Sequence, residues 1–191
     1  MKQKAIPGFG MAFCIARNEI RGMLYRVYEP ADFIHLYAVE EVCFEAPYRF
    51  SRAYMRQIVT SPDAATWMAE ENGTIAGFAV VEWAIELQQT TAYIQTIEVL
   101  PQLRRMGVAG ELMRRLEGSA IKAGARLIWL HVDAENSPAL SLYETRGYTR
   151  QGREENYYSR GRAALIYSKE LIPVPRPLFP VPSPLSLVPS P

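Results

Sequence analysis

Cysteine and histidine are both scarce in this sequence of 191 residues, which holds two of each. Cys14 and Cys43 cannot build a disulfide framework, and so few cysteines and histidines leave a structural zinc site without enough ligands. We therefore expect neither a disulfide scaffold nor a bound metal in this protein.

An excess of charge of one sign and long apolar runs are also missing. The 21 Lys and Arg residues nearly balance the 20 Asp and Glu residues, for a formal net charge of +1. Binding to duplex DNA needs clustered basic charge, so we expect no nucleic-acid partner. No uncharged apolar run reaches the roughly 18 to 20 residues that a membrane-spanning helix needs. We expect a cytoplasmic protein that does not associate with a membrane.

Both ends of the chain differ from its middle, which we predict to be one globular domain over residues 23–172. Residues 1–22 are apolar enough to imitate a secretory signal, but Pro7 and two glycines interrupt the run, so we expect a loose extension. Residues 173–191 are rich in proline, which lacks the backbone donor that a helix or sheet requires. We expect a disordered tail, and the alternative is a ligand for a module with an aromatic groove.

The middle of the chain alternates strand-like and helix-like segments, which is typical of a mixed α/β fold. Asn72 and Gly73 separate two strand-like runs and predict an antiparallel hairpin. The predicted strands span residues 24–27, 67–70, 75–86, 92–99, 127–132, 148–153 and 163–171. The predicted helices are one opened by Pro30 and Asp32, one capped by Ser51 and reaching Val59, and two over residues 108–123 and 138–146. In the first helix we expect a broad buried face made of Ile34, Leu36, Tyr37, Val39 and Val42.

The most informative stretch runs from Val99 to Gly110, where a predicted strand ends, arginines follow, and small residues open a helix. Backbone N–H groups at a helix start lack intrahelical partners and carry about half a positive charge, so they bind anions. Gly107, Ala109 and Gly110 would let a phosphate approach this backbone closely. The alternative is that the glycines only ease packing of the helix against the strand. The stretch is neither a Walker A loop nor a dinucleotide-binding fingerprint.

The pattern Arg104-x-x-Gly107-x-Ala109 resembles the Gln/Arg-x-x-Gly-x-Gly/Ala signature of the GNAT superfamily of acyl-CoA-dependent N-acyltransferases. The predicted order of strands and helices over residues 23–171 is also similar to that family. The resemblance implies a mixed, mostly antiparallel central sheet of six to seven strands flanked by about four helices. It further implies that the fourth and fifth strands splay apart and admit a thioester between them.

A second motif lies in residues 129–148, where Asn136 and small residues are followed by Leu142-Tyr143 and by Gly147-Tyr148. This segment most closely resembles the N-terminal protein acetyltransferases, including the bacterial ribosomal-protein-alanine type. Tyr157 and Tyr158 follow Asn156, as in the Asn-Tyr-Tyr of those enzymes, where it helps to line the peptide site. Three motifs at family spacing are far more specific than any one of them.

The resemblance implies acetyl-CoA as co-substrate and no metal. It places the pyrophosphate on the amides that follow Arg104, and it pairs the pantetheine arm with the backbone of Ile97 and Val99. The residues implied to bind the coenzyme are Ile97, Val99, Arg104, Arg105, Met106, Gly107, Val108, Ala109, Gly110, Asn136 and Tyr143.

Attack of an amine on a thioester needs an acid for the departing thiolate and a base for the amine. Tyr143 is the candidate acid, because a phenol of pKa about 10 suits a thiol of pKa about 8.5; its alternative role is an aromatic anchor for the last helix. His131 is the first candidate base, since its usual pKa near 6.5 suits proton removal near neutrality, and its alternative role is structural. Glu98 is the second candidate base, although strand alternation would turn it outward. Tyr93 is a candidate for ordering a water.

The resemblance implies that the acceptor site lies beside the link between the first two helices. Phe44, Tyr48 and Phe50 lie in this link and either cover the first side chain of a peptide or belong to the core. The resemblance implies that Tyr157 and Tyr158 also help to line the acceptor site.

We predict transfer of acetyl to a primary amine by direct attack in a ternary complex, since no positioned nucleophile pair is evident. The N-terminal α-amine of a protein or peptide, with a ribosomal protein as one example, is the expected acceptor. The alternatives are a small amine such as a polyamine, drug or amino acid, and a catalytically silent acyl-CoA-binding module. We expect a monomer or a weak homodimer.

Overall fold

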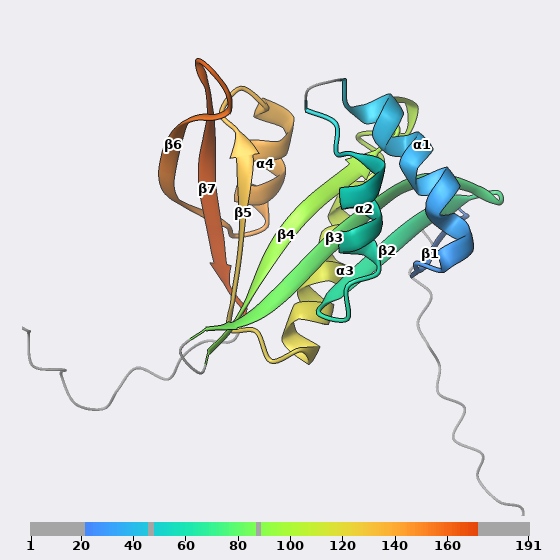
Figure 1. Cartoon of the computed structure of the whole chain (residues 1–191), viewed down its shortest axis with the longest axis horizontal. Coiled ribbons are helices and arrows are strands. Elements are labelled where there is room, and N and C mark those ends of the chain that lie inside the picture. Colours follow the sequence, from blue (N-terminus) through green and yellow to red (C-terminus); the bar gives the residue numbers. More distant parts are fainter. Residues whose placement is uncertain (1–21, 46–47, 87–88, 172–191) are drawn as a thin grey trace, which may run out of the picture.

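The computed structural model describes residues 22–45, 48–86 and 89–171 (Figure 1). The predicted loose extension and the predicted proline-rich tail lie outside the described residues, except for Gly22. The described residues include the whole segment that the sequence assigns to the acetyltransferase-like domain, apart from two short gaps and its last residue.

A seven-stranded sheet forms the centre of the molecule, in the order β1-β2-β3-β4-β5-β7-β6. Every neighbouring pair is antiparallel except β4 and β5, which are parallel. The strands are β1 Met23–Val27, β2 Ala64–Glu71, β3 Thr74–Glu86, β4 Gln89–Val99, β5 Leu127–Asp133, β6 Thr149–Ser159 and β7 Arg162–Glu170. The helices are α1 Phe33–Cys43, α2 Arg52–Val59, α3 Val108–Lys122 and α4 Ser137–Thr145, with 3-10 turns η1 Pro30–Asp32 and η2 Pro101–Leu103. The predicted mixed, mostly antiparallel fold is confirmed.

The parallel strands β4 and β5 pair over only a short stretch and then separate (Figure 1). Residues 91–93 of β4 pair with residues 127–129 of β5. Beyond these pairs β4 continues to Val99 and β5 to Asp133 without further pairing between them. The predicted splay of these two strands is therefore present, and it leaves one backbone edge of each strand unpaired in the sheet.

Two apolar clusters cover the two faces of the sheet. The helix α3 packs on one face, where Leu112 and Leu116 are fully buried. The helices α1 and α2 pack on the other face, where Met55 and Phe78 are fully buried (Figure 1). Because both faces are covered, the strands of the middle of the sheet bury side chains in both directions.

The first helix buries a narrower face than the sequence predicts. Leu36, Tyr37 and Val39 are buried as expected, but Ile34 is 64% exposed and Val42 is 58% exposed. The prediction of burial at those two positions is wrong. The helix packs through positions three and four apart, and the residues that it buries are Phe33, Leu36, Tyr37, Val39 and Glu40.

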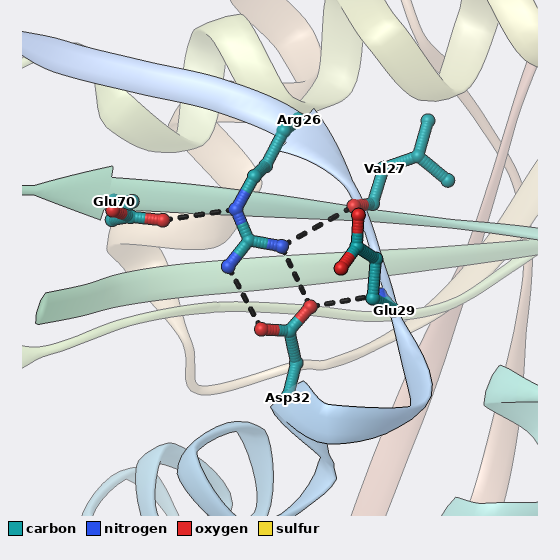
Figure 2. Close-up of polar contacts among 5 residues, drawn as sticks. All are labelled: Arg26, Val27, Glu29, Asp32 and Glu70. Carbon is teal, nitrogen blue, oxygen red and sulfur yellow. Dashed lines mark hydrogen bonds and ion pairs between the residues drawn. The ribbon is translucent and has the colours of Figure 1, made fainter. Parts of the chain in front are cut away.

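A partly buried ion-pair network fixes the start of the domain (Figure 2). The Arg26 guanidinium donates from Nη1 and Nη2 to the two carboxylate oxygens of Asp32, at 2.6 and 2.8 Å, and from Nε to Glu70 at 2.9 Å. These bonds hold the pKa of Asp32 below its usual range. Planar bidentate pairing of this kind fixes orientation as well as distance. The network therefore ties β1, β2 and the turn η1 that leads into α1.

An irregularity in β4 changes the direction of its last side chains. Val81 pairs with Ile94 and Val80 pairs with Thr96, so Gln95 is an extra residue in the strand. A bulge of this type re-aims the residues that follow it. Ile94 belongs to the cluster under α3, whereas Glu98 lies opposite Phe78, which faces α1 and α2.

None of the helices in the described ranges is both long enough and apolar enough to cross a membrane.

Candidate functional site

A cavity of about 1100 Å³ lies at the splay of β4 and β5. Its walls come from the end of α1, the end of β4, the start of α3, and α4 with the turn after it. The residues that line it are Cys43, Phe44, Ile97, Glu98, Val99, Leu103, Arg104, Arg105, Gly107, Val108, Ala109, Gly110, Asn136, Pro138, Ala139, Leu142, Tyr143, Thr145, Arg146, Gly147 and Lys169. The splay therefore brings together residues from both motifs that the sequence singles out.

The loop from Arg104 to Gly110 has the geometry of an anion-binding helix start. Gly107 is the N-cap of α3 and adopts a left-handed conformation with φ of 84°. The first intrahelical bond of this end runs from the Glu111 N–H to the Gly107 carbonyl at 3.1 Å. The amides before Glu111 have no acceptor within the helix, which is the arrangement that binds phosphates. These residues fit a pyrophosphate group.

Cationic side chains surround this loop, and they differ in how they are held. Arg104 turns back and donates from Nε to the Val99 carbonyl at 3.0 Å. Arg146 lies directly over Gly110, where a Cβ atom would collide with its guanidinium. A larger residue at position 110 would therefore displace the end of the Arg146 side chain. Met106 is 40% exposed and does not line the cavity.

Tyr143 lies in α4 and lines the cavity. The residue is 8% exposed, and burial raises the pKa of its phenol to about 12. The helix is held at its start by Asn136, whose Oδ1 accepts from the Ala139 N–H at 3.2 Å. Tyr143 therefore stays protonated at neutral pH, as a group that donates a proton must.

His131 lies on β5 among aromatic side chains and does not line the cavity. Its ring stacks on Tyr157 at a centroid distance of 4.3 Å and an interplanar angle of 15°. Its Nδ1 lies 3.1 Å from the Tyr93 hydroxyl, and its Nε2 lies 3.3 Å from Glu154 Oε2. Burial lowers the pKa of His131, and Glu154 opposes this effect. The ring is therefore neutral near pH 7, and both of its nitrogens have partners.

The predicted acceptor residues Tyr48, Tyr157 and Tyr158 join the same aromatic cluster. Tyr158 packs edge-on against Tyr48 at 6.5 Å and against Tyr157 at 4.9 Å. The Tyr48 hydroxyl lies 3.2 Å from Ser159 Oγ, and this bond is the main cause that lowers the pKa of Tyr48. We call the set Tyr48, Tyr93, Trp129, His131, Tyr157 and Tyr158 the aromatic wall. It connects the link after α1 with β4, β5 and β6.

The remaining two aromatic residues of the link have separate positions. Phe44 is 37% exposed and lines the cavity. Phe50 packs against the core under α1 and α2 and contacts Tyr54 at a centroid distance of 5.0 Å. For Phe50, the core alternative is therefore the correct one.

Glu98 lies inward, and the sequence alone did not reveal its main neighbour. The bulge at Gln95 directs Glu98 toward α1, where it is 2% exposed, although simple alternation would turn it outward. Its neighbour is Glu40, which is fully buried on α1. Burial, and then the contact with Glu40, raise the pKa of Glu98 well above its usual range. A glutamate at position 40, on the same helical stripe as Phe33, Leu36 and Tyr37, was the available signal.

Within the described ranges, no three His, Cys, Asp or Glu side chains are grouped so as to hold a metal ion.

Known proteins resemble this chain over parts of its length. A [ribosomal protein bS18]-alanine N-acetyltransferase of Escherichia coli is 33% identical over 88 residues, which are 46% of this chain and 57% of that protein. A streptothricin acetyltransferase of Streptomyces lavendulae is 35% identical over 111 residues, which are 56% of this chain and 58% of that protein. The chain thus spans little more than half the length of these two curated relatives.

The fold agrees with solved structures over a longer range. The crystal structure of the ribosomal-protein-S18-alanine N-acetyltransferase from Escherichia coli superimposes with a TM-score of 0.70 and 23% identity, covering 82% of this chain and 99% of that chain. Residues 25–148 match the family described as the acetyltransferase (GNAT) family. This match covers the Arg104–Gly110 loop, the segment from Asn136 to Tyr148 and the splayed strands β4 and β5, and the chain belongs to the GNAT acetyltransferase family.

Proposed function

We propose that the protein transfers acetyl from acetyl-CoA to the N-terminal α-amine of a protein or peptide. The observation that carries the proposal is the cavity at the splay of β4 and β5, which joins the Arg104–Gly110 loop to Tyr143. An anion site and a protonated phenol at two ends of one cavity are what a thioester of coenzyme A requires.

The coenzyme is assigned to the splay and to the start of α3. The amides from Arg105 to Gly110 would hold its pyrophosphate, with Asn136 beside it. On β4, Ile97 pairs with Ala79 of β3 on one side only, because β5 has already diverged. The edge of β4 at Ile97 and Val99, which β5 leaves unpaired, would accept the extended pantetheine arm as a sheet accepts another strand, although the Val99 carbonyl already accepts from Arg104.

In the proposed mechanism the amine attacks the thioester carbon directly. Tyr143 would give its proton to the departing thiolate. Glu98, on the cavity lining, and His131, on the aromatic wall with Tyr93 beside it, are the two candidates for taking the proton of the amine. The aromatic wall would border the peptide, with Phe44 near its first side chain.

An α-amine suits this site better than a lysine side chain does. Near pH 7.4, removing the proton of an α-amine costs about 1 kcal/mol, whereas removing that of a lysine costs about 4 kcal/mol. A weak base is enough for the first acceptor. The similarity to a ribosomal-protein-alanine N-acetyltransferase supports a protein N-terminus.

A small-molecule amine is the second candidate acceptor. The 35% identity with a streptothricin acetyltransferase favours this candidate over the region aligned. Both candidates share the same cavity and the same acid, so only the acceptor separates them.

The test is thiol release from acetyl-CoA with the full chain. The acceptors are short peptides that differ at the first residue, run beside spermidine, free lysine and streptothricin. We expect the wild-type protein to turn over one class of peptide N-termini. With the same peptides, the Tyr143→Phe variant should release thiol no faster than the background. Turnover confined to a small amine would select the second candidate, and binding of acetyl-CoA without turnover of any acceptor would identify a silent binding module.

A further inference from the structure

Two buried carboxyl groups meet beside the cavity, and the match to the family assigns neither. Glu40 is 0% exposed on α1, and Glu98 is 2% exposed on β4 and lines the cavity. Buried carboxylates need partners, because an unpaired charge removed from water is strongly unfavourable. The partners of this pair therefore decide its protonation.

In each carboxyl group, one oxygen accepts a hydrogen bond from a residue outside the pair, and the other oxygen has no hydrogen-bond donor among the described residues. Thr96 Oγ1 donates to Glu98 Oε1 at 2.8 Å, and the Phe50 N–H donates to Glu40 Oε1 at 2.6 Å. The Oε2 atoms of both residues are buried without a donor among the described residues. Two ionised carboxylates cannot satisfy one another, whereas one proton between them satisfies both.

The groups around the pair do not supply a counter-charge. Cys43 at the end of α1 interacts with both carboxyl groups, and burial raises the pKa of its thiol to about 11, so it stays a neutral thiol. Arg104 lies beyond Cys43, with Nη2 3.9 Å from Sγ, and its Nε is engaged by the Val99 carbonyl. The pair with one shared proton thus carries one negative charge beside the cavity.

His131, the first candidate base, lacks a free lone pair in this geometry. Glu154 at Nε2 favours the His131 tautomer with its proton on that nitrogen, and Nδ1 then accepts from Tyr93. A stacked Tyr157 ring covers one side of the imidazole. Glu98, in contrast, lies on the lining of the same cavity as Tyr143.

We propose that Glu98 takes the proton of the incoming acceptor ammonium, and that Glu40 is the positioning residue that holds it through a shared proton. The inference rests on the proposed acetyl transfer. The ligand of this part of the cavity is therefore a primary ammonium, which the single negative charge of the pair attracts.

The proton balance of the step is complete with the groups present. The ammonium gives one proton to Glu98, and the pair passes from one proton to two and loses its negative charge. The amine forms the C–N bond with the thioester carbon, and the C–S bond breaks as the thiolate takes a proton from Tyr143. After the attack, the nitrogen still carries one surplus proton, and this proton passes to the Tyr143 phenolate. The carboxyl pair gives its extra proton to water after the products leave.

The first test measures the shared proton directly and does not depend on activity. An infrared pH titration of the full chain should show a protonated-carboxyl C=O band that persists above neutral pH. In Glu98→Gln the band should be lost, and in Glu40→Gln it should disappear at lower pH, while Glu70→Gln, a matched change in the Arg26 network, should leave the band as it is. A band that all three variants leave in place, or no band in the wild type, would overturn the pair.

The second test follows thiol release against pH with two acceptors whose amine pKa values differ. Glu98→Gln should lower kcat by about 10²–10⁴-fold, the usual contribution of a general base. Glu40→Gln should move the acidic limb of the kcat/KM profile to higher pH, because the second carboxyl no longer stabilises the singly protonated pair, which a merely structural role would not do. A limb that His131→Gln abolishes and Glu98→Gln preserves would overturn the assignment. Absence of turnover with every amine would instead reject the proposed function, and the infrared band would still decide the pair.

Discussion

The Arg104–Gly110 loop and the aromatic wall lie at the same splay, but they are built in opposite ways. The loop presents backbone amides at the start of a helix and needs small residues at set positions. The aromatic wall is made of side chains from four separate parts of the chain, which stack and hydrogen-bond to one another. A short sequence motif is enough to produce the backbone geometry of the loop. The stacking of the aromatic side chains depends on the whole fold, because they come from distant parts of the chain.

This difference explains why the sequence predicts the proposed coenzyme site in more detail than the proposed acceptor site. A phosphate is bound by the same amides in any protein with such a helix start. An acceptor contacts whichever side chains the tertiary structure brings to the wall. Substitutions in the Arg104–Gly110 loop and substitutions in the aromatic wall therefore test the comparison separately.

The largest effect is expected at Tyr143, the residue proposed to give its proton to the departing thiolate. Tyr143→Phe removes one hydroxyl, and kcat should fall by about 10²–10⁴-fold, with little change in the affinity for acetyl-CoA. Because the pKa of Tyr143 is raised to about 12, the wild-type rate should show no loss from its ionisation up to about pH 10. Steady-state kinetics and calorimetry measure the two quantities. A kcat within about threefold of wild type would make Tyr143 only an aromatic anchor.

The next effect tests the backbone half of the comparison. Gly107→Val places a branched side chain at φ of 84°, a strain of about 1–3 kcal/mol that distorts the loop. If this strain energy is lost from the binding of acetyl-CoA, its dissociation constant should rise by about 5- to 150-fold. Calorimetry measures this affinity.

The matched control for this variant is Gly73→Val in the turn between β2 and β3. Gly73 has φ of 80° and open space around its Cβ position, so it suffers similar strain away from the cavity. The control should lose stability and keep its affinity for acetyl-CoA. Equal loss of affinity in both variants would mean that the loop does not hold the coenzyme.

A smaller effect is expected on the aromatic wall. His131→Gln removes the ring that stacks on Tyr157, and stacking contributes about 0.5–1.5 kcal/mol. The KM for a peptide acceptor should rise by up to about tenfold with the same pH profile. Tyr157→Phe, which keeps the stacked ring, should change the KM less than His131→Gln does.

A stability change should accompany the buried carboxyl pair. The pKa of Glu98 is raised in the folded protein, so the folded state holds its proton more tightly than the unfolded chain does. The free energy of unfolding should therefore fall as the pH rises above about 4.3, where the unfolded chain ionises, until the pH passes the raised pKa of the folded state. Glu98→Gln should gain stability over the wild type between pH 5 and pH 8 in denaturant titrations. A constant difference across that range would show that Glu98 titrates normally.

The smallest effect is expected from the two ends of the chain. A protein limited to residues 23–172 should keep the turnover of the full chain, since neither end resembles part of the acetyltransferase domain. A loss of more than about tenfold, or about 1.4 kcal/mol in the activation barrier, would show that an end reaches the site.

Much of the fold follows from local sequence signals. The hairpin at Asn72-Gly73, the Ser51 cap of α2 and the start of α3 at Val108 are all where the sequence predicts them. These features depend on residues a few positions apart, so short patterns are sufficient. The wrong predictions concern positions whose burial depends on tertiary packing. Ile34 and Val42 belong to the predicted apolar face of the first helix, but the sheet does not cover them.

Contiguous motifs were enough to specify the family, the strand–loop–helix that suits a phosphate, and Tyr143 as the phenol beside it. The surroundings of Glu98 and His131, in contrast, became known only from the folded chain. The bulge at Gln95 turns Glu98 toward Glu40, which lies 58 positions earlier in the chain. The protonation of a titratable group depends on the burial and charges around it, and those come from distant residues that no local pattern specifies.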